Sequence, residues 1–385
     1  MAAENEITVA ARSFRAVAGR EDYFTVQATG GGDFAVALAA VEEAYREAVR
    51  AAGLGPESAV FRRVLVSDIA NQGALVRAGA LAGDGESGPV ALSVVQQPPL
   101  PPGRLALLAC HLHGGVSKRR LSPRLLEVVK SGRRHLWSTG ITGGATVPPV
   151  DAGAQTETVF AALTGDLAAE GATLARDCHR TWLYVKGVDV FYQDLVERRN
   201  VLFGELGLGR ETHSIASTGI EGACGGRYEV VGLDAYSVPG LEPAQVSYLD
   251  APERIGATYD YGVAFERCTR LAYADRAHFL LSGTASIDPA GNVVHPGDVD
   301  RQLERALANV DALLSAGGAG LADLMHLTAY VRDAADAERV RDALAALLPG
   351  LPCLLVLAPV CRPEWLVEVE GVAIARRDDP ALPAF

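Results

Sequence analysis

The stretch DVDRQLERALANVDALLSAGGAGLADLMHLTAYVRD, residues 298–333, decides the fold. Apolar residues recur at steps of three and four, as at Leu303, Leu307, Val310 and Leu314, which predicts a helix with one buried face. A glycine-marked turn follows, and the apolar run after it predicts a buried strand. The helix therefore needs a surface to cover its apolar face, and a sheet is the natural partner.

The same pattern of helix, turn and strand occurs twice more, at residues 33–68 and 154–189. Each copy is preceded by a strand candidate and followed by a second helix and two apolar strands, and the first copy shows this pattern most weakly. Self-similarity at a regular interval indicates repeated structural units. The sequence therefore predicts an α+β chain of three tandem units, each a sheet backed by two helices.

We place the units at residues 1–130, 131–255 and 256–385. The first is the degenerate copy, and the C-terminal one carries most of the expected catalytic residues. A chain of 385 residues with 49% hydrophobic content is long enough to bury a large core.

Net charge and the N-terminal sequence exclude several classes of partner. The formal charge is −12 and the chain has no long run of Lys or Arg, so we expect neither nucleic acid nor a membrane surface as a partner. The N-terminal residues MAAENEITVAARSF lack the pattern of a signal peptide, and no stretch approaches the roughly 18 apolar residues of a membrane span. We expect a cytoplasmic protein.

Cysteine and histidine spacing argues against a metal site. The six cysteines are scattered without a CxxC pair, which favours reduced thiols over a disulfide framework or a zinc site. His111 and His113 form an HxH pair with no second pair of ligands nearby, and we expect them to point outward from a half-buried strand.

The third unit resembles the RidA-like (YjgF-like) family. The resemblance rests on FLLSGTASID, on a Q-x-x-x-A-x-x-N helix at Gln302 to Asn309, on YVRD, and on CRPEWLVEVEGVAIA. RidA proteins are trimers of such a unit, so three units in one chain look like a covalent pseudo-trimer. With SGTASIDPAGNVVHPGDV and LVLAPVCRPEWLVEVE, the chain resembles the chorismatases of this fold over most of its length.

This resemblance implies tandem RidA/YjgF (chorismate mutase-like) α/β sandwich units in a monomer with internal pseudo-threefold symmetry. It also implies that the protein converts chorismate to 3-hydroxybenzoate and pyruvate in secondary metabolism. The reaction is an acid-initiated loss of the enolpyruvyl group, so no metal ion or organic cofactor is expected.

Glu368 is the acid that the resemblance implies. Breaking an enol ether starts with a proton delivered to the methylene carbon, which requires a carboxylic acid whose pKa burial has raised. Glu368 and Glu370 are two apart in a predicted strand and so share a face, where two like charges raise each other's proton affinity. The alternative is that both lie on a solvated face of the sheet.

Two residues just before this strand have roles that only the resemblance supplies. Arg362 corresponds to the arginine that binds substrate carboxylate in the RidA-like family, and a guanidinium can bind such a group through two parallel hydrogen bonds. Cys361 stands where a cysteine marks the chorismatases that form 3-hydroxybenzoate. Taken alone, these residues would be a surface charge and a small core residue.

The second carboxylate needs a further group, for which Arg267 is the first choice. The neighbouring Cys268 departs from the small residue that the family prefers there. In the second unit, residues expected to face Glu368 across an interface are Tyr184, Arg180, Thr218 and Gly219.

Other functions remain open at this stage. Within the same chemistry, the product could be 3,4-dihydroxycyclohexa-1,5-dienoate or 4-hydroxybenzoate. A RidA-type imine or enamine deaminase would use the same arginine on a smaller substrate. A ligand-binding protein without catalysis would lack an acid in the cleft.

Overall fold

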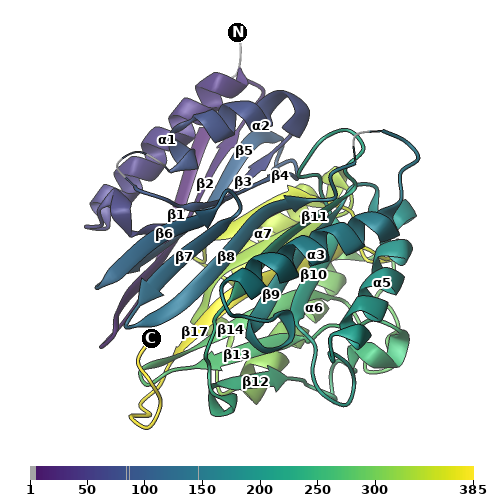
Figure 1. Cartoon of the computed structure of the whole chain (residues 1–385). Coiled ribbons are helices and arrows are strands. Elements are labelled where there is room, and N and C mark those ends of the chain that lie inside the picture. The colour runs from purple at the N-terminus through teal and green to yellow at the C-terminus, as the bar shows by residue number, and fades with distance from the viewer. Residues whose placement is uncertain (1–5, 84, 86, 146) are drawn as a thin grey trace.

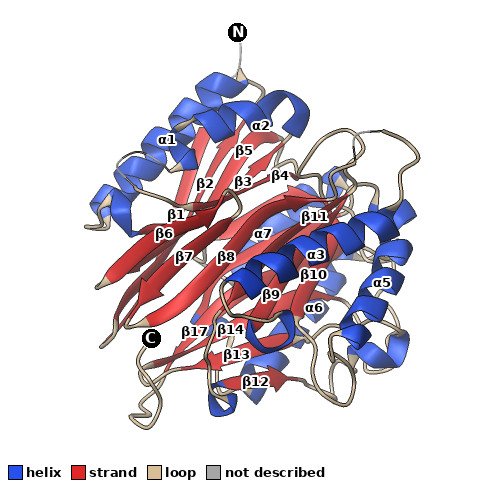
Figure 2. Cartoon of the chain, in the orientation of Figure 1, coloured by secondary structure: helices blue, strands red, loops and turns tan. Residues whose placement is uncertain are grey.

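The computed structural model describes residues 6–83, 85, 87–145 and 147–385, which fold into three mixed sheets with helices on their outer faces (Figure 1). Figure 2 shows the strands gathered at the centre and the helices around them. The α+β class expected from the sequence is confirmed.

The first sheet is covered by the helices α1 (Phe34–Ala51) and α2 (Ile69–Ala78). Its strands are β1 (Glu6–Ala16), β2 (Gly19–Thr29), β3 (Ala59–Val66), β4 (Ala91–Gln96) and β5 (Gly103–His113).

The second sheet is covered by α3 (Ala152–Ala169) and α5 (Val188–Glu205), and the short helix α4 (Leu174–Asp177) precedes its strand β9. Its strands are β6 (Val116–Ser122), β7 (Leu125–Lys130), β8 (Arg133–Thr142), β9 (Cys178–Val185), β10 (Ala216–Glu221) and β11 (Val231–Ser237).

The third sheet is covered by α6 (Val299–Ala316) and α7 (Ala337–Leu347). Its strands are β12 (Val246–Leu249), β13 (Cys268–Ala272), β14 (Arg276–Ala285), β15 (Leu324–Val331), β16 (Cys353–Leu357) and β17 (Val367–Arg376).

The three sheets repeat one strand order. The first runs β1-β2-β5-β3-β4, the second contains β7-β8-β11-β9-β10, and the third contains β13-β14-β17-β15-β16. In each, the last strand of the unit lies at the centre and pairs antiparallel with two neighbours, while a parallel pair closes one edge. The tandem repeat expected from the sequence is therefore confirmed. A threefold axis relating the units, and a monomeric state, stay predictions.

Each of the long first helices begins at an aspartate. Asp33, Asp151 and Asp298 have extended backbone, and their carboxylates accept hydrogen bonds from backbone N–H groups of the first turn. Such caps satisfy donors that have no partner within the helix. The same residue type therefore marks the start of the first long helix in all three units.

The sheets continue past the expected limits of the units. In the second sheet, β7 pairs with β8 and β6 pairs with β7, although both strands precede the division at residue 130. Strand β12 pairs with β13 in the third sheet, although it precedes the division at residue 255. The unit boundaries expected from the sequence stay a proposal, and the sheets themselves span residues 6–113, 116–237 and 246–376.

His111 does not point outward as expected. Its side chain is buried, and its ring nitrogens contact the hydroxyl groups of Tyr45 and Ser58. Burial satisfied by two hydroxyls explains this histidine without a metal ion, and it lowers the pKa of His111 to about 3. Among the described residues, no helix combines the length and apolar character needed to cross a membrane.

One apolar cluster extends through all three units. It includes Phe61 and Leu108 from the first sheet, Trp182 from the second, and Phe279 and Leu327 from the third. A shared core makes the units depend on one another for burial, unlike independent domains joined by linkers.

We therefore predict a single cooperative unfolding transition. Leu108→Ala, in the first unit but facing the shared core, should lower the free energy of unfolding of the whole chain by about 2–5 kcal/mol. Leu75→Ala on the exposed face of α2 is the control and should change it by less than about 0.5 kcal/mol. Urea denaturation followed by circular dichroism measures both. Two resolved transitions, with Leu108→Ala affecting one of them, would contradict a shared core.

Candidate active site

Glu368 lies where the second and third units meet. It is on β17, paired between β14 and β15, and its side chain is only 5% exposed. The edge strand β10 of the second sheet packs against this region through bridges from Ala216 to Glu266 and from Ile220 to Val360. The carboxyl group is therefore buried at an interface, and the alternative of a solvated sheet face is wrong.

A pocket with about 550 Å³ of empty space, part of it open to solvent, lies at this interface. Its walls come from the two units and are lined by Tyr192, Arg199, Ser217, Thr218, Gly219, Val263, Phe265, Arg267, Gly283, Ala285, Ile287, Cys361, Arg362, Trp365 and Glu368. Concave, partly apolar pockets with a few convergent polar groups are typical ligand sites.

Burial and the neighbouring charge of Glu370 raise the pKa of Glu368 to about 8, against the opposing effect of Arg267 and Arg180. Desolvation is the largest cause, since the charged form loses its water. Glu368 is therefore protonated at neutral pH and able to donate a proton. A carboxylic acid in this state has the property that general acid catalysis requires.

Glu370 behaves in the opposite way because it is surrounded by donors. Burial alone would raise its pKa, but Arg180 and Arg63 lower it below the ordinary range, with help from hydrogen bonds. Arg180 Nη2 lies 2.6 Å from Oε2, and Trp182 Nε1 donates to Oε1 at 2.9 Å. The hydroxyl of Thr218 also donates to Oε2. The two carboxyl groups of one strand thus hold opposite protonation states.

Thr218 links this pair to the pocket wall. Its oxygen accepts hydrogen bonds from Arg180 Nη2 at 2.6 Å and from the backbone N–H of Gly283 at 2.9 Å, in addition to donating to Glu370. A hydroxyl suits this place because it donates and accepts at once. The hydrogen bond from Gly283 to Thr218 fixes the position of β14 beside Glu368.

Two glycines give the side chains of the site their space. A Cβ at Gly283 would lie 2.4 Å from Glu368 Oε1, and one at Gly219 would lie 2.7 Å from the ring of Tyr192. Gly283 lies where the register between β14 and β17 shifts, as in a β-bulge. Neither position has room for a larger residue while the neighbouring side chain stays in place.

Cys361 lies in the loop between β16 and β17 and lines the pocket beside Tyr192. Burial, together with the charge of Glu368, raises the pKa of the Cys361 thiol to about 12, although the Tyr192 hydroxyl and Arg362 oppose the shift. The sulfur is therefore a neutral thiol, not a thiolate nucleophile.

Both arginines proposed as carboxylate clamps lie at the pocket. Arg362 donates from Nη1 to the carbonyl oxygen of Gly291 at 3.0 Å and lies over the ring of Trp365, 4.8 Å from its centroid. Arg267 donates from Nη2 to the carbonyl oxygen of Gly256 at 3.0 Å. These contacts orient the guanidinium groups at the pocket wall.

The structure brings together six of the eight residues singled out from the sequence. Those that line the pocket are Glu368, Cys361, Arg362, Arg267, Thr218 and Gly219. Arg180 lies behind it and pairs with Glu370. Tyr184 is fully buried elsewhere and donates to Asp234 at 3.2 Å, so it does not line this pocket. Cys268 is also buried in the core outside the pocket.

The sequence analysis missed several lining residues, above all Tyr192 and Arg199 on α5. In the sequence, Arg199 looks like one of two adjacent surface arginines. However, it lies four residues after Leu195 and four before Phe203, both of which are buried. That spacing places Arg199 on the buried face of the helix and could have identified it.

Corresponding positions in the other two units lack the acid. Strand pairing places Gly232 on β11 and Ala106 on β5 where β17 has Glu368. By the same registers, Asp234 and Leu108 correspond to Glu370. A carboxylate recurs in the second unit, but an acid at the Glu368 position is found in the third unit and not at these two positions.

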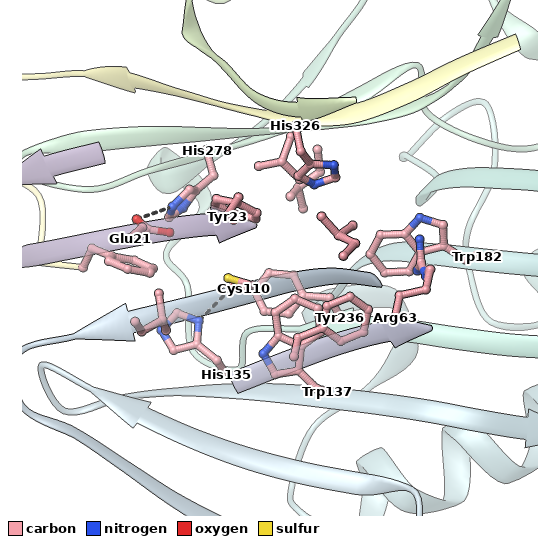
Figure 3. Close-up of a pocket in the computed structure, with 16 residues that line it drawn as sticks. Glu21, Tyr23, Arg63, Cys110, His135, Trp137, Trp182, Tyr236, His278 and His326 are labelled. Carbon is pink, nitrogen blue, oxygen red and sulfur yellow. Dashed lines mark hydrogen bonds and ion pairs between the residues drawn. The ribbon is translucent and has the colours of Figure 1, made fainter. Parts of the chain in front are cut away.

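A second pocket lies at the centre of the molecule, where side chains from all three sheets meet (Figure 3). Its walls are mostly apolar and aromatic. Its carboxylate, Glu21, is paired with Arg276 at 2.6 Å and with His278 at 2.8 Å. Arg63 on its wall reaches Glu370 at 3.3 Å. This pocket is linked to the site through the ion pair of Arg63 with Glu370. Its lining residues include no protonated acid comparable to Glu368.

Comparison with known protein families identifies a match for the third unit. Residues 269–375 match the family Endoribonuclease L-PSP. A solved structure of a chorismatase has the same fold, with a TM-score of 0.62 at 21% identity, and the match covers 82% of this chain and 93% of that one. The fold is thus that of a protein with tandem RidA-like units.

Sequence similarity then points to one group of such proteins. A chorismatase from Streptomyces hygroscopicus is 31% identical over 210 residues, which are 50% of this chain and 60% of that protein. A 3-hydroxybenzoate synthase from the same organism is 32% identical over 146 residues, 34% of this chain and 42% of that protein. The chain matches about three fifths of the chorismatase and less of the synthase. Over these segments, the chain is similar in sequence to the chorismatases.

We predict that Gly283→Ala disturbs the acid. A methyl group 2.4 Å from Glu368 Oε1 forces the carboxyl group to move, and such overpacking costs about 1–3 kcal/mol of stability. The control is Gly165→Ala on the exposed face of α3, where a Cβ would meet nothing within 4 Å and helix propensity should favour alanine. Thermal unfolding measures the difference. Equal stability of the two variants would show that the space beside Glu368 is not constrained.

Proposed function

We propose that the protein processes chorismate by acid-initiated loss of pyruvate, forming 3-hydroxybenzoate. One observation carries this proposal: Glu368 is a buried acid that is protonated at neutral pH, in a pocket whose walls contain arginines. The similarity to a chorismatase and to a 3-hydroxybenzoate synthase supports the choice of substrate. A non-catalytic binding protein would not need a neutral acid facing its ligand.

The first step uses the proton of Glu368. Chorismate carries an enolpyruvyl ether whose methylene carbon is nucleophilic. Transfer of the Glu368 proton to this carbon makes a methyl group and an oxocarbenium ion, which weakens the bond between the ether oxygen and the ring. Glu370 keeps the proton on Glu368 until this moment, because its fixed negative charge opposes ionisation of the neighbouring acid.

The second step removes pyruvate and makes the ring aromatic. The ring hydroxyl attacks the neighbouring carbon and gives its proton to the Glu368 carboxylate, the electron pair of the breaking C–O bond leaves with pyruvate, and an epoxide-like intermediate forms. Opening of the epoxide, with loss of one proton from the ring carbon and gain of one proton on the oxygen, gives 3-hydroxybenzoate and leaves Glu368 protonated. The two products together contain the atoms of chorismate, so the reaction consumes neither water nor a redox partner.

The arginines of the pocket hold the anionic substrate. Arg362 and Arg267 are placed by backbone carbonyls and present charged donors, which bind carboxylates through charge-assisted hydrogen bonds. Arg267 also acts electrostatically on Glu368, and we assign it to the enolpyruvyl carboxylate that lies next to the protonated carbon. Holding the substrate in one orientation converts proton transfer into a step within a single complex.

Cys361 favours 3-hydroxybenzoate over the hydrolysis product. The neutral thiol at the pocket wall can assist transfer of hydrogen as the ring becomes aromatic, and it leaves less room for a water molecule. Hydrolysis to 3,4-dihydroxycyclohexa-1,5-dienoate and formation of 4-hydroxybenzoate are the competing outcomes. Incubating the purified protein with chorismate and identifying the aromatic product by liquid chromatography and mass spectrometry decides among them.

We predict that Glu368→Gln lowers turnover of chorismate by about 10²- to 10⁴-fold, the range of general acid catalysis. The amide keeps the shape of the side chain but has no proton to give. In the unmodified protein, Glu368 is protonated below pH 8 and ionised above it. The value of kcat/KM should therefore be steady below pH 8 and fall about tenfold per pH unit above it.

The control for Glu368→Gln is Glu364→Gln, a solvent-exposed position four residues earlier. It should leave both the rate and the pH profile unchanged. Residual activity of Glu368→Gln within about tenfold of the unmodified protein, or a basic limb that persists in this variant, would exclude Glu368 as the acid.

We predict that Cys361→Ala changes the product ratio. Both products need the proton of Glu368, so removing the thiol should act after protonation and raise the share of the dihydroxycyclohexadienoate. A change of about 1.4 kcal/mol in relative barrier alters the ratio tenfold. Cys353→Ala, outside the pocket, is the matched control. If Cys361→Ala has an unchanged turnover rate and product ratio, Cys361 only packs against its neighbours and does not influence the reaction.

A further inference from the structure

Arg199 is a buried cation at the wall of the pocket. It lies on α5 of the second unit, is 1% exposed, and lines the same pocket as Glu368. Charged side chains are almost never fully buried unless they are paired. Its place in the pocket therefore calls for an explanation.

The guanidinium of Arg199 has donors without partners. Within the described part of the chain, its Nε and Nη2 atoms are buried and make no hydrogen bond. These two nitrogens lie on one edge of the guanidinium plane, the edge that offers two parallel N–H groups to a carboxylate. A fork of this kind, left open at a pocket, has the geometry of a carboxylate-binding group.

Two other arginines that are as deeply buried as Arg199 are paired with carboxylates. Arg180 contacts Glu370 at 2.6 Å, and Arg276 contacts Glu21 at 2.6 Å. Among the described residues, the groups that act electrostatically on Arg199 are Tyr192 on its own helix, Cys361 on the loop before β17, and Tyr259, none of which is a carboxylate. The ring of Phe203 lies 5.9 Å from the guanidinium carbon. Desolvation lowers the pKa of Arg199, and these neighbours offset only part of the effect.

We propose that Arg199 binds the ring carboxylate of the substrate through its Nε and Nη2 edge. This proposal rests on the proposed function and deepens it, because chorismate carries two carboxylates. Cys361, assigned to the ring, is among the groups next to Arg199, whereas Arg267 acts on Glu368 at the opposite reacting end. The general ligand class for this subsite is a planar, ring-borne carboxylate such as a benzoate.

This assignment has a consequence for stability. An unpaired buried charge is a cost to the folded state, which the protein retains because the charge binds ligand. Replacing Arg199 with an apolar residue of similar length should therefore weaken ligand binding without lowering the melting temperature. A structural role for Arg199 predicts the opposite combination.

The experiment compares Arg199→Met with Arg198→Met. Arg198 is the residue before Arg199 on the same helix, partly exposed and paired with Glu157 at the surface, so the control removes the same charge outside the pocket. Binding of 3-hydroxybenzoate, which carries the ring carboxylate and lacks the enolpyruvyl group, is measured by titration calorimetry. Thermal unfolding is measured for each variant with and without this ligand.

We expect Arg199→Met to weaken 3-hydroxybenzoate binding and to raise KM for chorismate by about 100-fold, since two charge-assisted hydrogen bonds are lost. Its melting temperature without ligand should equal or exceed that of the unmodified protein. Arg198→Met should bind as the unmodified protein does. If Arg199→Met fails to fold, Arg199→Lys, which keeps the charge but loses the fork, should still weaken binding.

Unchanged affinity for 3-hydroxybenzoate in a folded Arg199 variant would overturn this proposal, even if chorismate is turned over. Failure of the unmodified protein to convert chorismate would instead overturn the proposed function. The affinity comparison with 3-hydroxybenzoate would then still decide whether Arg199 binds a ring carboxylate.

Discussion

The ion pairs of Glu370 hold the three units and the acid in one arrangement. This carboxylate belongs to the third unit, Arg180 to the second and Arg63 to the first, and all three side chains are almost fully buried. Removing one partner from a buried pair costs about 3–5 kcal/mol, because an uncompensated charge remains. Because Glu370 stays ionised here, it also raises the pKa of Glu368, two residues away on the same face. Assembly of the units and chemistry at the pocket thus depend on the same charge.

The repeated units have different tasks although they share one strand order. At the interface of the first and second units, Ser93 donates to Asp234 as Thr218 donates to Glu370 at the other interface. Strand pairing shows that these hydroxyls occupy corresponding places, and Leu354 is the third member of the set. The hydroxyl and carboxylate are therefore structural features of two interfaces. The interface of the second and third units differs from the other because it also has the acid Glu368.

Much of the fold could be predicted from the sequence, because the periodicity of buried helices and strands is strong. The long helices, their aspartate caps and the apolar strands such as β15 and β17 all carry that pattern. Strand β6 was missed because its sequence, VSKRRLS, is mostly polar and charged, as is common at sheet edges. Strand β12 was missed because it has only four residues, VSYL. For the site, adjacent motifs indicated Glu368 and Arg362. Arg199 could have been found from its spacing to Leu195 and Phe203 on one helix face. Tyr184 required knowledge of which face its strand turns toward the interface, and this depends on contacts between units far apart in the sequence.

The pocket combines two groups that burial drives toward their neutral forms. Desolvation favours the protonated state of Glu368, which suits an acid, but it disfavours the cation of Arg199. Binding of a dianionic ligand favours the charged form of Arg199 and the protonated form of Glu368. Its carboxylates stabilise the arginine cation, and their charge further opposes ionisation of Glu368, so the acid stays loaded with its proton when substrate is present. Once the enolpyruvyl group has left, one carboxylate is no longer attached to the ring, and the remaining monoanion is held by fewer charged contacts. On this argument, the charges that load the acid also favour release of the product.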